Sequence, residues 1–312
     1  MDDVTDTVFR QVVATTAPAD LYFTEFVNVD GLQSVGRPNL LKKLRFAPGE
    51  TNLIAQLWGK DPENFRKTAA QIADGTFARE LGLPSGCNFV GIDLNMGCPA
   101  KSEVKNGTCS ALIQNRPLAG EIISATQDGA AGRLPVSVKT RIGWNEIDHT
   151  WAEFLLGYRL NMLTVHGRTK KEMSKVPAHW DEIQKVRELR DALAPDTLIV
   201  GNGDVTSYAQ GMQLAAEHGL DGIMIGRGIF HDPYVFAPES PWVSISREQR
   251  IDLYRRHVSL FAETWKHNER PIHTLNKFCK VYISDFDGAK ELREQLMNAE
   301  STDELLAILN QA

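Results

Sequence analysis

Residues 197–228 read TLIVGNGDVTSYAQGMQLAAEHGLDGIMIGRG and contain two β-type runs on either side of a segment with helical period. Each run ends in small residues, GNGD at 201–204 and IGRG at 225–228. Strands that alternate with helices are typical of a parallel sheet covered by helices. In (β/α)₈ barrels a phosphate site is frequently built after strands seven and eight, so we assign the two runs to those positions.

The same alternation extends through the chain before this stretch. It predicts strands at 21–27, 52–58, 89–95, 135–141, 162–166, 197–202 and 221–226, and helices within 62–81, 118–130, 180–193 and 207–218. Only seven strands are visible, and the chain opens on a helix-like segment at 4–16. We therefore predict an α/β fold, a (β/α)₈ TIM-type barrel whose first strand is missing, and a start that is internal to a longer natural product. An open or doubly wound seven-stranded sheet is the alternative.

The pattern of hydrophobic residues changes after about residue 236. A Pro/Ser-rich linker, PESPWVS at 238–244, is followed only by segments of helical period. Within 247–263 an apolar stripe at spacings of three and four consists of Ile251, Tyr254, Val258 and Phe261. We predict a catalytic barrel domain at 1–236 and an all-α domain at 241–312.

Composition excludes several classes of protein. The 312 residues are 42% apolar with a net charge of −6, which is typical of a globular chain. Four cysteines without a C-x-x-C pair argue against a zinc site and for a reducing compartment. The acidic N-terminus is no secretory signal, and no apolar run approaches the roughly 18 residues of a membrane span. We expect a cytoplasmic monomer with no metal and no membrane contact.

Reactive side chains follow consecutive predicted strands. The segment DLNMGCP at 93–99 overlaps the end of the predicted strand at 89–95 and continues beyond it. Lys139 lies near the end of the predicted strand at 135–141, and His166 ends the one at 162–166. Singly, Cys98 fits a core position, Lys139 a surface position and His166 a buried hydrogen-bonded one. Together they predict an active site, because the carboxyl ends of barrel strands meet at one mouth.

The glycine-rich ends favour a phosphate group at the same mouth. Small residues let backbone N–H groups approach an anion, and Arg227 adds a cation. The dinucleotide pattern G-x-G-x-x-G does not occur, so a mononucleotide cofactor is favoured. A lysine beside an electron-poor ring can stabilise negative charge on a reduced flavin.

Taken together, these motifs resemble those of the tRNA-dihydrouridine synthases. The resemblance covers nearly the whole chain and rests on the opening MDDVTD with FR at 9–10, TEFV at 24–27, QLWG at 56–59, DLNMGCP at 93–99, SVKTR at 137–141, VHGRT at 165–169, GNGD at 201–204 and IGRG at 225–228.

The resemblance implies that FMN reduces the C5=C6 bond of a uridine in tRNA to 5,6-dihydrouridine, with NADPH or NADH as electron donor. Cys98 would protonate C5, as a thiol with an ordinary pKa near 8.5 is mostly protonated at neutral pH. The cofactor-binding residues that it implies are Met1, Gln56, Lys139, His166, Asn202, Gly203, Asp204, Gly226 and Arg227. Asn95 and Arg168 would contact the substrate. Lys277 would contact tRNA from residues 241–280, which carry eight Lys or Arg against four Asp or Glu.

One loop departs from the family pattern. After the VHGRT motif the family usually has Gln, Tyr, Gly and Asp where this chain has Glu172, Ser174, Val176 and His179.

Three other functions remain as alternatives to a tRNA-dihydrouridine synthase. They are an FMN-dependent reductase of a free pyrimidine, a colourless Schiff-base aldolase that uses Lys139, and a non-catalytic tRNA-binding protein. The sequence leaves open which uridine is modified.

Overall fold

The computed structural model describes residues 1–312, apart from the side chain of Asn268, and the chain forms two compact units. The first unit comprises Met1–Asp2, Asp20–Val205 and Ala209–Gly226. The second comprises Asp3–Ala19, Thr206–Tyr208 and Arg227–Ala312. These units follow contacts within the chain, and the assignment of catalytic and tRNA-binding roles to 1–236 and 241–312 stays a prediction.

A parallel sheet forms the centre of the first unit, and every pair of neighbouring strands in it is parallel. Its order is β1-β3-β4-β5-β6-β7-β8, and β2 also pairs with β3. The strands are β1 (Tyr22–Phe23), β2 (Val27–Asn28), β3 (Leu53–Trp58), β4 (Gly91–Asn95), β5 (Val136–Arg141), β6 (Met162–His166), β7 (Leu198–Asn202) and β8 (Gly222–Met224).

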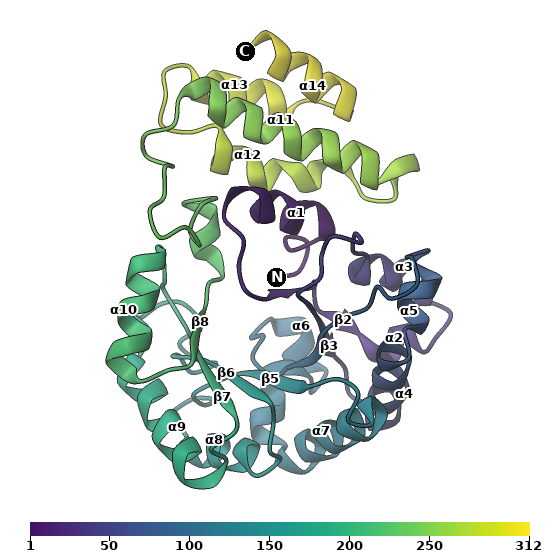
Figure 1. Cartoon of the computed structure of the whole chain (residues 1–312), viewed down its shortest axis with the longest axis vertical. Helices are drawn as coiled ribbons and strands as arrows, with labels where there is room; N and C mark the ends of the chain where they lie inside the picture. Colours follow the sequence, from purple (N-terminus) through teal and green to yellow (C-terminus); the bar gives the residue numbers. More distant parts are fainter. The chain divides into compact units, whose positions relative to one another are not determined.

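The predicted fold class, a curled parallel sheet of barrel type with helices around it, is confirmed. Figure 1 shows the sheet curling inside a ring of helices in which α7, α8, α9 and α10 are labelled. Among the described strands, β8 pairs with β7 and β1 with β3, and no pairing joins β8 to β1. The path therefore contains seven strand positions, as the sequence predicts.

The first predicted strand differs from the expectation, since it is divided into β1 and β2. Thr24 N still donates to Ile54 O at 3.0 Å, but Gln56 N then donates to the Thr24 side-chain Oγ1 at 3.0 Å. A side-chain oxygen thus takes the place of a ladder carbonyl, and regular pairing resumes only at Val27.

Helices of different lengths connect the strands of the first unit. They are α2 (Val29–Leu32), α3 (Arg37–Leu41), α4 (Pro62–Ala73), α5 (Thr76–Glu80), α6 (Lys101–Lys105), α7 (Arg116–Ala130), α8 (His149–Leu156), α9 (Trp180–Leu193) and α10 (Tyr208–His218), with the short 3₁₀ helices η1 (Lys42–Leu44) and η2 (Cys109–Gln114). The helix predicted within 62–81 is two helices, because Gly75 at φ +75° adopts the left-handed conformation that ends α4. A Cβ at Gly129 of α7 would lie 2.1 Å from Arg66 O of α4, so these helices approach closely.

The second unit is helical. It contains α1 (Thr7–Thr16), α11 (Arg247–Thr264), α12 (Asn276–Tyr282), α13 (Ala289–Met297), α14 (Thr302–Gln311) and the 3₁₀ helices η3 (Arg227–Phe230), η4 (Lys266–Asn268) and η5 (Ile272–Leu275). The apolar stripe predicted within 247–263 is buried, with Ile251, Tyr254, Val258 and Phe261 all below 5% exposed. Ser246 begins α11 with a reciprocal capping box to Gln249. Among the described residues, no helix combines the length and apolarity that a bilayer crossing requires.

Candidate active site

The strand ends of the first unit carry polar side chains on one face of the sheet. Gln56 lies opposite Asp93, Asn95 opposite Lys139, and His166 opposite Asn202. Residues paired across neighbouring strands point to the same side of a sheet, so side chains from five strands share one face. The sequence predicted this convergence for Lys139 and His166, and the register explains it.

Asp93 carries a buried carboxyl group on this face of the sheet. Its Oδ2 accepts from Gln56 Nε2 and its Oδ1 from Ser137 Oγ, both at 2.7 Å, and none of the residue is exposed. Burial raises the pKa of Asp93 to about 6, although the two hydrogen bonds and the charge of Lys139 favour ionisation. The sequence places Asp93 in the DLNMGCP motif but predicts no separate role for it.

Lys139 provides the cation of the site. Its Nζ donates to Asn202 Oδ1 at 3.0 Å, and Asn202 Nδ2 in turn donates to Met224 O at 2.8 Å. Burial, and then the charge of Arg141, lower the pKa of Lys139 to about 8, while the charges of Asp93 and Cys98 oppose this shift. The side chain therefore remains an ammonium group at neutral pH, fixed between β5 and β7.

Cys98 lies in the loop that follows β4. Asn95 Oδ1 accepts from the amides of Gly97 at 3.2 Å and of Cys98 at 3.0 Å, and Arg141 Nε donates to Gly97 O at 2.7 Å. These bonds fix the backbone that carries the thiol, which is half-buried.

The thiol itself is not in an ordinary environment. A hydrogen bond from Cys109 lowers the pKa of Cys98 to about 7. Sequence reasoning took an unperturbed thiol with a pKa near 8.5, and the difference arises from a residue 11 positions further along the chain. The sequence alone predicts no role for Cys109.

Arg168 follows His166 and is held by protein groups. It is 3% exposed, its Nε donates to Val176 O at 2.5 Å, and it pairs with the carboxylate of Asp204. Its Nη1 lies 3.2 Å from His166 Nε2. Because a guanidinium group only donates hydrogen bonds, His166 Nε2 is the acceptor in this contact. A substrate-binding role for Arg168 stays a prediction.

The altered residues after VHGRT fold their loop back on itself. Glu172 Oε2 accepts from Thr169 N at 2.8 Å, and Glu172 Oε1 lies 3.0 Å from His179 Nε2. His179 N donates to Gly167 O at 2.7 Å. Two of the residues that depart from the family pattern are thus partners of each other.

The two glycines at the ends of β7 and β8 differ in the space around them. Gly203 has φ +145°, and a Cβ there would lie 2.5 Å from Ala178 Cβ, so a side chain is excluded. A Cβ at Gly226 would meet no atom within 4 Å. Met1 also belongs to the first unit and is half-buried, whereas Arg227 and Lys277 belong to the second unit and are exposed. Their predicted contacts stay predictions.

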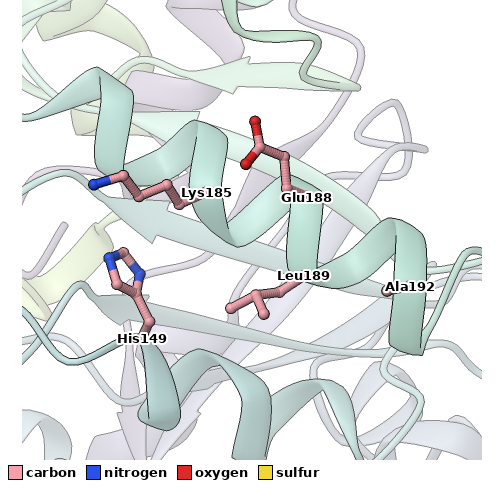
Figure 2. A pocket seen from close by; sticks show the side chains of 5 residues that line it. All are labelled: His149, Lys185, Glu188, Leu189 and Ala192. Atoms are coloured by element: carbon pink, nitrogen blue, oxygen red, sulfur yellow. The ribbon is translucent and has the colours of Figure 1, made fainter.

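A pocket on the outside of the first unit is separate from these strand ends. It has a volume of about 360 Å³ and is lined by residues of α8 and α9: His149, Lys185, Glu188, Leu189 and Ala192. Figure 2 shows Leu189 between the two helices and the Glu188 carboxylate pointing away from His149. His149 Nε2 and Lys185 Nζ both pair with Glu182, at 2.7 and 2.8 Å, so the charged groups of this pocket already have protein partners.

Comparisons with known proteins agree with the motifs at the strand ends. The family model described as "Dihydrouridine synthase (Dus)" matches residues 1–312. A "Probable tRNA-dihydrouridine synthase" of Staphylococcus aureus (strain COL) is 44% identical over 314 residues, which cover 100% of this chain and 90% of the relative. The "Probable tRNA-dihydrouridine synthase 2" of Bacillus subtilis (strain 168) is 43% identical over 313 residues, with coverages of 99% and 91%.

A solved structure supports the fold alone. The histamine dehydrogenase from Rhizobium sp. 4-9 aligns with a TM-score of 0.52 at 12% identity, over 83% of this chain and 47% of that chain. Because the family model spans the whole chain and curated relatives exceed 40% identity, this chain belongs to the dihydrouridine synthase family.

Proposed function

We propose that this protein is a tRNA-dihydrouridine synthase that binds FMN, uses NADPH as electron donor and reduces one uridine of tRNA to 5,6-dihydrouridine. The observation that carries the proposal is that Asn95 lies opposite Lys139 in the sheet and its Oδ1 accepts from Cys98 N at 3.0 Å, which links the cation and the thiol-bearing loop. The names of the Staphylococcus and Bacillus relatives support tRNA as the substrate.

The residues of the first unit fit a flavin mononucleotide. Lys139 offers a buried cation, and the side chains of Gln56, His166 and Asn202 offer hydrogen-bonding groups on the same face. Thr164 lies opposite Lys139 in the sheet, and its buried Oγ1 has no hydrogen-bond partner among the described residues. Such a polar atom is expected where a bound polar group completes the site.

We assign the phosphate end of FMN to the glycine-rich strand ends. The backbones of Asn202, Gly203, Asp204, Gly226 and Arg227 would hold it, and at Gly226 the absence of a side chain leaves open space beside the main chain. Met1 would complete the cofactor contacts. Once bound and reduced by NADPH, FMN would supply the hydride for C6 of the uridine.

The protein's own groups bind the base and supply the proton. Asn95 would hydrogen-bond the target uridine, and Arg168 would contact the substrate from the loop after β6. The S–H bond of Cys98 breaks as the C5–H bond forms, which leaves a thiolate on Cys98. A base paired or stacked in tRNA must leave its stack before it can reach this thiol.

The second unit would hold the tRNA backbone. Five cations of residues 241–280 are exposed: Arg247, Arg256, Lys266, Lys277 and Lys280. Lys277 Nζ donates to Asp3 O at 2.6 Å and keeps further N–H groups that can face a phosphate. Such contacts fix register and orientation without reading sequence.

The test is dihydrouridine formation by Cys98→Ala on tRNA that lacks the modification, assayed together with the flavin absorbance of the purified protein. We expect the variant to keep FMN and to lose most turnover. Cys87→Ala is the matched control, since Cys87 is another half-buried thiol of the first unit. Unchanged turnover in Cys98→Ala would refute the acid role.

The same assay separates the alternatives. Equal turnover on free uridine and on tRNA would favour a reductase of a small pyrimidine. A colourless protein that binds tRNA without reducing it would favour a non-catalytic tRNA-binding protein.

A further inference from the structure

A second thiol lies against the proposed acid. Cys109 begins η2, and the amide of the next residue, Ser110, donates to Cys98 O at 3.2 Å. This bond brings the two cysteine backbones together, and the interaction of the Cys109 thiol with the Cys98 thiol is the leading cause that lowers the pKa of Cys98. Cys98 is half-buried, whereas no part of Cys109 is exposed. The mechanism above does not use Cys109.

The backbone at Cys109 is held in an unfavourable conformation. Its φ of +53° lies in the left-handed region, which residues with a side chain seldom adopt. The preceding residue is fixed, because Thr108 N and Thr108 Oγ1 both donate to Glu103 O, at 3.0 and 2.9 Å. A thiol at a position where glycine would relieve strain suggests a functional reason for the side chain.

The burial of the two thiols decides which one donates. Cys109 has no exposure to water, and its contact with Cys98 together with burial raises the pKa of Cys109 far above its ordinary value. Cys109 therefore keeps its proton throughout the physiological range. Cys98, which is accessible, is the partner that ionises and accepts the hydrogen bond.

We propose that Cys109 is a positioning residue whose S–H donates to the sulfur of Cys98 and stabilises the thiolate that remains when Cys98 has given its proton to C5. This inference rests on the proposed function for its catalytic meaning. The S–H bond of Cys98 breaks and the C5–H bond forms, the electron pair stays on the Cys98 sulfur, and a proton from solvent later restores the thiol. Cys109 acts only through the sulfur of Cys98 and makes no contact of its own with the base.

The first measurement needs neither tRNA nor turnover. Only a thiolate reacts with iodoacetamide, so the pH dependence of Cys98 alkylation in the purified full-length protein, followed by mass spectrometry of its peptide, reports the ionisation of Cys98. Wild-type protein should show a midpoint near pH 7. Cys109→Ala should shift the midpoint toward that of an ordinary thiol, near 8.5, and slow alkylation at pH 7 by roughly tenfold.

Two further variants control this result. Cys109→Ser keeps a hydrogen-bond donor and should remain closer to wild type than Cys109→Ala, whereas Cys87→Ala should not differ from wild type. Cys109→Gly suits the left-handed backbone and removes the thiol without strain, so it replaces Cys109→Ala if the alanine variant melts at a lower temperature.

The second measurement is the pH profile of dihydrouridine formation. Because protonated Cys98 is the acid, wild-type activity should fall as pH rises through about 7. In Cys109→Ala this limb should move to higher pH, while turnover on the acidic plateau decreases because the weaker acid transfers its proton more slowly.

Either of two results overturns the proposal: identical alkylation midpoints in Cys109→Ala and wild type, or a serine variant that shifts as far as the alanine variant. A failure of the proposed function is distinguishable. A protein that makes no dihydrouridine but shows the alkylation shift would retain the thiol pair and lose only its assignment to uridine.

Discussion

The strand ends of the first unit and the helical core of the second unit both bury titratable side chains, with opposite results. At the strand ends the pKa of Asp93 is raised by burial to about 6, and that of Lys139 is lowered by burial to about 8. In the second unit, burial lowers the pKa of His257 to about 3. The first pair titrates close to neutral pH, and the histidine stays neutral at any physiological pH.

The partners of each group explain this difference. Asp93 and Lys139 each feel the other's opposite charge, and Asp93 also accepts two hydrogen bonds that favour its ionised form, so the effect of burial is partly offset. His257 has Tyr282 Oη at 3.0 Å from its Nδ1 and lies among aromatic rings, the nearest being Phe278 with ring centroids 4.7 Å apart. Burial alone makes a side chain inert, while burial beside an opposite charge prepares it for proton and charge chemistry.

The largest expected effect comes from removing the cation of the strand ends. Lys139→Met should lower dihydrouridine formation by about 10²–10³-fold, because fixed charge in a buried site is a dominant catalytic term. We also expect a lower ratio of bound flavin to protein. Steady-state kinetics and flavin absorbance provide the measurements, with Lys139→Arg as the variant that keeps the charge. A methionine variant with turnover within tenfold of wild type would contradict this role.

An intermediate effect is expected in the second unit, on stability in acid. The pKa of His257 is lower in the folded state, about 3, than in the unfolded state, about 6.5, so its contribution is complete above pH 6.5 and is lost as pH falls toward 3. Between pH 7 and pH 4.5 this loss amounts to roughly 3 kcal/mol of unfolding free energy.

Urea unfolding of wild type and His257→Gln at the two pH values checks this estimate. Glutamine does not titrate and can still pair with Tyr282, so the variant should lose about 3 kcal/mol less than wild type over the same pH interval. Equal losses in the two proteins would mean that His257 is not kept neutral by the fold.

The smallest effect is expected at Asp93. Asp93→Asn keeps the shape, and its amide can accept from Gln56 and donate to Ser137, but it removes the charge that raises the pKa of Lys139. The pKa of Lys139 should then fall below its value of about 8, so that loss of the Lys139 proton adds to the alkaline limb set by Cys98 and steepens it near pH 7. We expect a decrease of a few-fold at pH 7, seen in the pH profile of turnover. A profile identical to that of wild type would show that Asp93 does not act on Lys139.

Much of the fold and part of the site could be predicted from the chain alone. Alternating strands and helices predicted a parallel barrel-type sheet with seven visible strands, because hydrophobic period and glycine-rich strand ends are local properties. Lys139 and His166 were placed at one edge because consecutive parallel strands end at the same side. The division of 21–27 into β1 and β2 was missed, because the Thr24 hydroxyl replaces a carbonyl only when β3 lies beside it.

By itself, the sequence determined which residues end the strands, which family motifs they form and which family the chain belongs to. Only the tertiary structure decided the protonation behaviour of those residues. The pKa of Cys98 depends on Cys109, and that of Lys139 on burial and on its neighbours Arg141 and Asp93. Electrostatic energy and desolvation depend on distances through space, and these distances exist only after segments far apart in the sequence have packed together.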